Sequence, residues 1–254
     1  KGSFQLCVML SNCTSPANFK PTKQAAVGSG SVSRVYMKCN VFSNPGIIGS
    51  SYIQIGGTKF ICCVICPITS YKPRLLSSVD SGEIECNIVY PTYAQLSSVD
   101  VKAMEISLST TVREVMESAV QLDYYPKQRI EVRGVVLQSS SCDLTSAING
   151  VGLALADASV RMIDLPCSSS VIFDVSSSDT LPAEIVSESH IVQNNSSSQI
   201  VHLNITAFPA LGTVTYCHMQ GRVAGSYLVA AQSVAMERCK SMRELMGSAL
   251  RDKT

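Results

Sequence analysis

The residues best suited to bind a metal ion are cysteines and histidines. The 254 residues include eleven cysteines and three histidines. Cys63 and Cys66 have the Cys-x-x-Cys spacing of many metal sites, in the stretch "TKFICCVICP". This stretch has strand composition, and residues three apart in a strand point to opposite faces, so the pair is not expected to chelate one ion. His190, His202 and His218 follow no ligand spacing. We therefore expect no metal and no cofactor.

A second chemical feature is the hinge Cys142-Asp143-Leu144, which lies within "LQSSSCDLTSAINGVGLALADASV". It separates a β-branched run from an apolar, small-residue segment that is typical of a helix. The start of a helix after a strand can hold an anion on free backbone N–H groups. This hinge carries an aspartate and no basic residue, which opposes anion binding. Asp143 or Thr145 is also a natural helix cap, so the aspartate has a structural explanation as well.

Composition sets the class of protein. The chain is 46% hydrophobic with a net charge of +1, which lacks the strong basic surface of an autonomous nucleic-acid-binding protein. Any RNA contact is therefore expected to be local. No apolar run approaches the roughly 20 residues that span a bilayer, and residues 1–30 are too polar for a signal peptide. We expect a soluble intracellular protein without membrane contact, with its cysteines reduced and buried.

The first half of the chain predicts strands followed by a helix. Strands are expected at 34–42, 50–67 and 82–90, with a hairpin turn at Gly56-Gly57 inside the second range. Residues 99–123 have the apolar spacing of an amphipathic helix that "YYP" ends. The apolar positions of this helix are Met104, Leu108, Val112, Val115, Met116, Ala119 and Leu122.

The second half of the chain alternates strands and helices. We expect a strand at 128–138, a helix after the hinge, strands within 160–175 and 200–223, and a closing helix over 226–251. Residues 1–33 are predicted to be an irregular arm, 34–254 a domain, and 176–198 a polar insertion or hairpin. This order indicates an α+β fold in which helices pack on mixed β-sheets. The closing helix repeats Ala231, Val234, Ala235, Met242, Leu245, Met246 and Ala249.

Three segments together resemble the ribonuclease PH family: "GSSYIQIGGTKFICCVICP", "YYPKQRIEVRGVVLQ" and "AINGVGLALADASVRMIDLP". The resemblance runs from about Arg34 to the C-terminus, and "LALADASV" followed by "MIDLP" is its most specific part. It implies a ribonuclease PH-like fold and a place in the six-membered ring of the RNA exosome. The implied partners are other ribonuclease PH-like subunits in a heterodimer within that ring, S1/KH-type cap subunits and single-stranded RNA in the channel. The implied locations are the nucleus, nucleolus and cytoplasm.

The same resemblance identifies the hinge as the phosphate site of active members, which resemble one another in carrying Gly-Thr-Arg there. This chain has Cys142, Asp143 and Leu144 instead, so the arginine position is filled by leucine. Active members also carry a carboxylate on a downstream strand, where this chain has His202. The basic pair at the start of their long helix is reduced to Lys102. We therefore expect no catalytic residue in this chain.

Other parts of the family pattern are weaker. The Asp-Gly-Arg signature expected near the N-terminus has no counterpart. Asp174 and Asp179 are possible remnants of acidic residues, although turn carboxylates in a Ser-rich stretch explain them better.

RNA contact is expected from loops that face the ring channel. The resemblance places Lys72 and Arg74, in "TSYKPRLLSS", near the channel, and Lys102 is a third RNA-binding candidate. A solvated surface loop explains Lys72 and Arg74 equally well. Two functions therefore remain open: a non-catalytic ring scaffold that supports 3′-to-5′ RNA processing and degradation, and an active phosphate-dependent 3′-to-5′ exoribonuclease.

Overall fold

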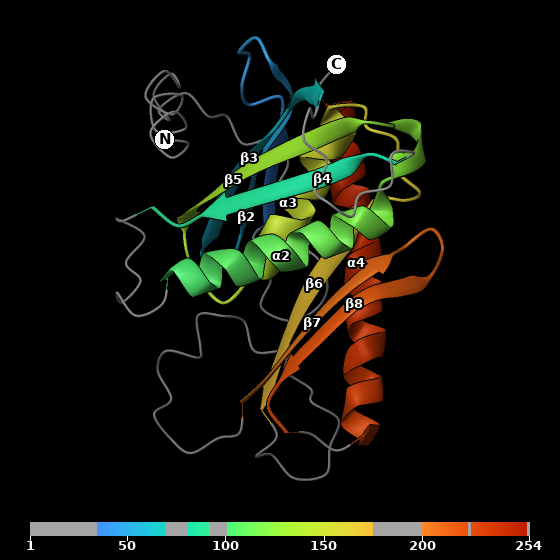
Figure 1. Cartoon of the computed structure of the whole chain (residues 1–254). Helices are drawn as coiled ribbons and strands as arrows, with labels where there is room; N and C mark the ends of the chain where they lie inside the picture. The colour runs from blue at the N-terminus through green and yellow to red at the C-terminus, as the bar shows by residue number, and fades with distance from the viewer. Residues whose placement is uncertain (1–34, 70–80, 92–100, 175–199, 223–224, 253–254) are drawn as a thin grey trace.

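A computed structural model describes residues 35–69, 81–91, 101–174, 200–222 and 225–252 of the chain. Within these residues two β-sheets pack with three α-helices, as Figure 1 shows. The α+β architecture predicted from the order of the elements is confirmed. No helix in these ranges is both long enough and apolar enough to cross a bilayer.

The larger sheet has five strands in the order β1-β2-β3-β5-β4. Its strands are β1 (Val35–Cys39), β2 (Ile47–Ile55), β3 (Thr58–Thr69), β4 (Glu83–Val89) and β5 (Gln128–Gln138). The predicted hairpin turn joins β2 and β3, and Gly56 adopts a φ of 56° there, a conformation that favours glycine. Strand β4 pairs parallel with β5, whereas the other neighbours are antiparallel.

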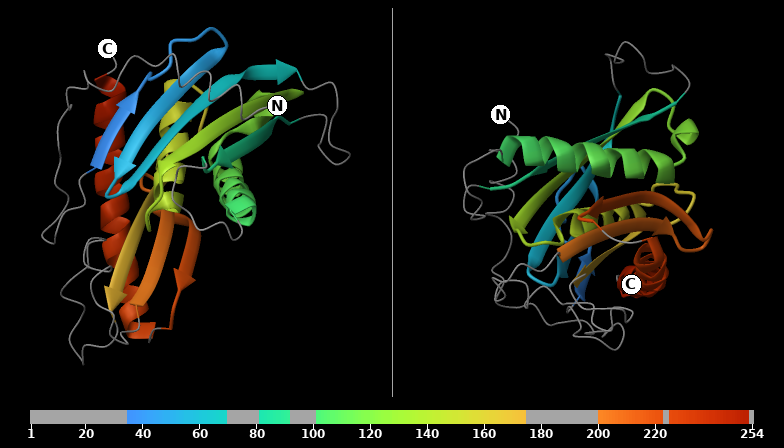
Figure 2. Two further views of the ribbon diagram at one scale, coloured as in Figure 1. Left: turned by 90° about the vertical axis from the view of Figure 1, so that its left-hand side faces the viewer. Right: turned by 90° about the horizontal axis from the view of Figure 1, so that it is seen from below.

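The smaller sheet is antiparallel, in the order β6-β7-β8. Its strands are β6 (Cys167–Asp174), β7 (Ile200–Phe208) and β8 (Thr213–Gln220). Helix α4 (Gly225–Arg251) packs on β6 and β7 and extends to β1 of the larger sheet, which Figure 2 shows from two further sides. This long helix therefore joins the two sheets.

Helix α3 (Asp143–Asp157) lies against β2 and β3 and also contacts β6, so it occupies the centre of the fold. Its glycines allow this close packing. A Cβ built on Gly150 of α3 would lie 2.6 Å from the Phe60 ring, and one built on Gly134 of β5 would also lie 2.6 Å from that ring. Phe60 itself is 0% exposed. The ring is therefore clamped between two backbone segments that tolerate only glycine.

The first long helix is shorter than predicted. Helix α2 covers Val101–Ala119 and is followed by a 3₁₀ turn, η2 (Leu122–Tyr124), which takes Leu122 out of the helix. Leu108 and the four later apolar positions through Ala119 are buried as expected. Met104, the first apolar position of the predicted helix, is not buried: burial begins at Leu108, and Met104 is 41% exposed.

Strands were predicted within 160–175, and only one is present. It is β6, and the residues before it form a single isolated bridge between Met162 and Val120. Pro166 lacks a backbone N–H group, which limits ladder formation ahead of β6. The predicted arm 1–33 and the predicted insertion 176–198 lie outside the described residues.

Candidate functional site at the start of helix α3

The carboxylate of Asp143 accepts four hydrogen bonds from three parts of the chain. Thr58 Oγ1 and the Ser140 backbone N–H donate to Oδ1, at 3.0 Å and 2.9 Å. The Tyr90 hydroxyl and Ser139 Oγ donate to Oδ2, at 3.0 Å and 2.6 Å. A carboxylate that receives several donors is strongly held, because hydrogen bonds to a charged acceptor are about twice as strong as neutral ones.

This arrangement corrects the predicted cap. The N-cap residue of α3 is Cys142, it makes no side-chain cap bond, and Asp143 is the first helical residue. Its side chain points back to the preceding loop and to neighbouring strands rather than to the N–H groups of its own helix. The negative charge still lies at the end of the helix that the helix dipole favours for anions.

Tyr90 links this carboxylate to helix α2. It follows β4 and is 8% exposed, and its backbone N–H donates to Glu105 Oε1 at 2.8 Å. Burial raises the pKa of the Tyr90 hydroxyl strongly, and the charge of Asp143 and the hydrogen bond to it raise that pKa further. The hydroxyl therefore stays protonated and donates to Asp143 across the physiological pH range.

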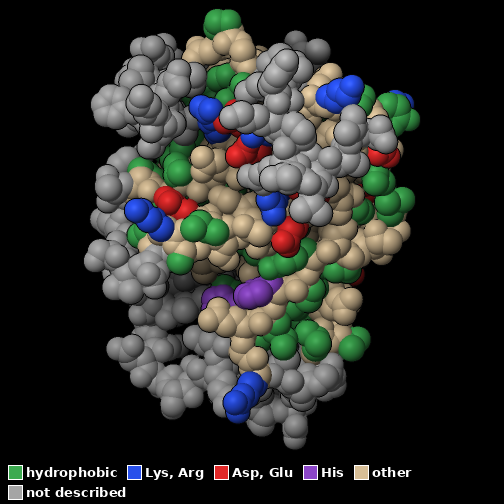
Figure 3. Space-filling model, in the orientation of Figure 1, with side chains coloured by type: hydrophobic (Ala, Val, Ile, Leu, Met, Phe, Trp, Pro, Cys, Tyr) green, Lys and Arg blue, Asp and Glu red, His purple; other side chains and the backbone are tan. Residues whose placement is uncertain are grey.

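The start of α3 also meets the smaller sheet. Thr145 is 2% exposed, and its hydroxyl lies 3.5 Å from Asn204 Oδ1 on β7. His202 lies two residues earlier on β7 and therefore on the same face as Asn204. Asn204 pairs directly with His218 of β8, which makes the two histidines diagonal neighbours. Figure 3 shows the histidine side chains next to each other on the face turned toward the viewer.

The chemistry available on this face is that of neutral polar groups. Burial lowers the pKa of His202, which favours its uncharged form at neutral pH. Strands β7 and β8 contain no Asp or Glu, so neither strand supplies a carboxylate opposite Asp143. Among the described residues, no three His, Cys, Asp or Glu side chains gather as they would around a metal ion.

The remaining predicted site residues are spread over the fold. Leu144 is half-buried and packs against the main apolar core. Lys102 is exposed in the first turn of α2. Lys72, Arg74 and Asp179 lie outside the described residues.

Sequence reasoning found Asp143 but missed its donors. Thr58, Tyr90 and Ser139 come from the start of β3, the end of β4 and the loop before α3. One signal was present for Tyr90, because it continues the inward alternation of Ile84 and Ile88 on β4.

Residues 31–161, just over half of the chain, match the model of the 3′ exoribonuclease family (RNase PH), domain 1. The chain belongs to this family. The match includes the five-stranded sheet, α2 and α3, and therefore the Asp143 site.

Relatives of this ribonuclease PH-like chain include exosome components. It is 28% identical over 204 residues to the Arabidopsis thaliana "Exosome complex component RRP41-like". The match covers 80% of this chain and 73% of that protein. It is 26% identical over 223 residues to "Exosome complex component ski6" of Schizosaccharomyces pombe, covering 84% of this chain and 85% of that protein.

Two solved structures share the ribonuclease PH fold with this chain. Rice (Oryza sativa) Rrp46 superposes with a TM-score of 0.66 at 16% identity, covering 92% of this chain and 98% of that one. A chain of the Archaeoglobus fulgidus exosome with RNA bound to the active site superposes with a TM-score of 0.64 at 15% identity, covering 84% and 87%. At these identities the likeness establishes the fold.

Proposed function

We propose that this protein is a non-catalytic, ribonuclease PH-like ring subunit of the RNA exosome. In this role it supports 3′-to-5′ RNA processing and degradation by building the ring and its channel. Its relatives in plants, fission yeast and archaea are named as exosome components, which supports the proposal that this chain is a subunit of that assembly. Within this class we propose the silent mRNA-transport-regulator type of subunit, which the hinge and the tail "ERCKSMRELMGSAL" resemble.

We propose that catalysis is absent because of where the Asp143 carboxylate lies. The donors that converge at the start of α3 already bind this internal anion. A phosphate there would also meet its charge, and two unit charges 4 Å apart repel by about 4 kcal/mol at an effective dielectric constant of about 20. Leu144 follows where active relatives are expected to carry the phosphate-binding arginine, and it offers no compensating charge.

The edge of the smaller sheet supports a role in assembly. Strand β8 is the last strand of this sheet, and Val214 (39%), Cys217 and Met219 (40%) on it are exposed. A long edge strand that also presents apolar side chains is a surface on which another subunit can pair. We propose a heterodimer with another ribonuclease PH-like subunit within a six-subunit ring, together with S1/KH-type cap subunits and single-stranded RNA in the channel.

The deciding experiment measures phosphorolysis. The purified protein, alone and with a ribonuclease PH-like partner, is incubated with single-stranded RNA and inorganic phosphate, and release of nucleoside diphosphates is followed. We expect none from this chain, and we expect co-expression to give a one-to-one heterodimer. Phosphate-dependent release by the unmodified chain alone would establish the alternative, an active exoribonuclease. Fluorescent tagging tests the proposed nuclear, nucleolar and cytoplasmic locations.

A further inference from the structure

Three large apolar side chains, each more than half exposed, gather on one side of the molecule. They are Tyr124 (59%), Ile163 (52%) and Leu211 (55%). They come from η2, from the segment between α3 and β6, and from the turn between β7 and β8. These three segments lie side by side at the right of Figure 1 and at the right of the second view in Figure 2. We call Tyr124, Arg161, Ile163 and Leu211 the Tyr124 patch.

One side-chain contact and two main-chain hydrogen bonds hold the first two segments together. The Arg161 guanidinium lies over the Tyr124 ring, 4.2 Å from its centroid. The Gln121 N–H donates to the Arg161 carbonyl at 3.1 Å, and the Ile163 N–H donates to the Ala119 carbonyl at 2.8 Å. The patch is therefore not a set of free side chains on separate loops.

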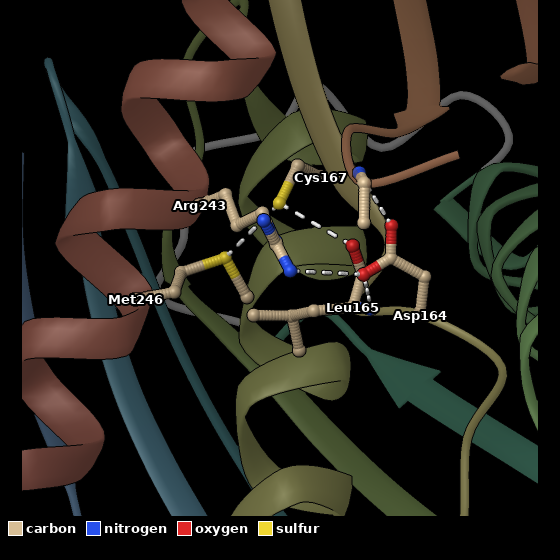
Figure 4. A network of polar contacts seen from close by, with 6 residues as sticks. Asp164, Leu165, Cys167, Arg243 and Met246 are labelled. Carbon is tan, nitrogen blue, oxygen red and sulfur yellow. Dashed lines mark hydrogen bonds and ion pairs between the residues drawn. The ribbon is translucent and has the colours of Figure 1, made fainter. Parts of the chain in front are cut away.

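A buried carboxylate fixes the third segment. The Asp164 side chain is 6% exposed and lies 3.6 Å from Arg243 of α4, as Figure 4 shows. Its two oxygens accept the N–H groups of Leu165 and Ala210, each at 2.8 Å. Because Asp164 follows Ile163 and Ala210 precedes Leu211, one carboxylate positions both exposed side chains. A surface held in place in this way loses little conformational entropy on binding.

The patch contains an arginine without an ion pair. Arg161 is exposed and has no carboxylate partner among the described residues, whereas Arg243, which is 47% exposed, is ion-paired with Asp164. Asp164 is buried and already bonded, which leaves Asp123 as the exposed carboxylate next to the ring of Tyr124. Tyrosine and arginine are among the residues enriched at the energetic centres of protein interfaces.

We propose that the Tyr124 patch is a contact surface for a different protein, whose contacting face carries an apolar side chain flanked by carboxylates. The carboxylates would pair with Arg161, and the apolar side chain would cover Ile163 and Leu211. RNA fits this surface less well, because aliphatic side chains offer no ring on which a base can stack and Arg161 already covers one face of Tyr124. The proposal does not depend on whether the protein degrades RNA.

The test uses the full chain in the complex that it forms in its own cells. A photoreactive phenylalanine derivative replaces Ile163, the complex is irradiated, and cross-linked peptides are identified by mass spectrometry. We expect one partner protein, cross-linked within a segment that contains Asp or Glu. Arg161→Glu should lower the cross-link yield at least tenfold, and reversing the partner's carboxylates to lysine should restore it. Arg222→Glu, an exposed cation beyond the far end of β8, is the matched control and should leave the yield unchanged.

Three results would overturn the proposal. The first is a cross-link to RNA or to a second copy of this chain, and the second is no cross-link at all. The third is a protein cross-link whose yield Arg161→Glu leaves unchanged. Circular dichroism of the Arg161→Glu protein separates these results from misfolding, because Arg161 is exposed and its substitution should leave the thermal midpoint within a few degrees.

Discussion

The Tyr90 hydroxyl donates to the Asp143 carboxylate at 3.0 Å and so joins the end of β4 to the first turn of α3 across 53 positions of the chain. Both residues have other partners, since Tyr90 also binds Glu105 of α2 through its backbone and Asp143 also binds Thr58. A substitution at this contact should therefore change the stability of the whole sheet–helix layer.

Asp143→Ala is expected to lower the free energy of unfolding by about 3 kcal/mol, because it leaves buried hydroxyl donors without their acceptor. Tyr90→Phe should cost about 1 to 2 kcal/mol, because it removes one donor and keeps the ring. Urea denaturation of both single variants and the double variant gives the coupling energy, which we expect near 1 kcal/mol. Additive effects would show that the contact contributes no energy of its own.

Leu144→Arg alone is not expected to create phosphate binding, because Asp143 still repels the anion. Asp143→Thr combined with Leu144→Arg should bind inorganic phosphate measurably by titration calorimetry. This double variant should still release no nucleoside diphosphate, because β7 has no carboxylate. Phosphate binding by the single variant would show that Asp143 does not block the site.

Stability should depend on pH through His202. Because its folded pKa lies below the unfolded value of about 6.5, the unfolded state binds more protons as the pH falls through that range. The contribution of His202 is therefore neutral above pH 7 and destabilising below about pH 6. The thermal midpoint of the unmodified protein should fall further between pH 7.5 and pH 5 than that of His202→Gln. Parallel pH curves for the two proteins would contradict this.

Gly150→Ala should destabilise the protein by about 1 to 3 kcal/mol, because its Cβ would overlap the buried Phe60 ring. Gly247→Ala is the matched control, since its Cβ would meet only Arg251 Nη2 at 3.8 Å. That control should stabilise the protein by up to about 1 kcal/mol, the difference in helix propensity. Thermal unfolding of both variants tests whether the two substitutions change the stability in opposite directions.

Replacing Lys72 and Arg74 by glutamate should weaken RNA binding by the assembled ring while leaving assembly intact. The dependence of affinity on salt should become shallower by up to two phosphate contacts, at about 0.7 per contact for single strands. Sequence preference should not change, because phosphates carry no base identity. Equal affinities and equal slopes across a salt series would assign both residues to the solvated surface.

Local sequence patterns predicted a helix or strand well where its buried residues repeat with the period of that helix or strand. Ile84, Cys86 and Ile88 alternate inward along β4, and the strand appears where expected. The same reasoning failed for Met104, because periodicity defines the inward face of a helix and not how much of its length is covered.

The candidate site was predictable only in part, because local sequence does not show tertiary contacts. The hinge can be found in the sequence because an acidic residue lies at the start of a helix. Its role depends on hydroxyl groups at positions 58, 90 and 139, which the sheet topology brings together. A single sequence contains the acceptor but not the tertiary distances to its donors. For the same reason Asp143 was expected to cap its helix and instead binds the neighbouring strands.

The parallel pairing of β4 with β5 has a consequence for synthesis on the ribosome. Strands β1 to β3 pair with their sequence neighbours and can form as soon as they emerge. Strand β3 then has one unpaired edge until β5 is made, and β4 has no partner in the larger sheet until the same moment. During translation of α2 the nascent chain therefore exposes the open edge of an apolar strand, and such an edge is a template for pairing with another chain.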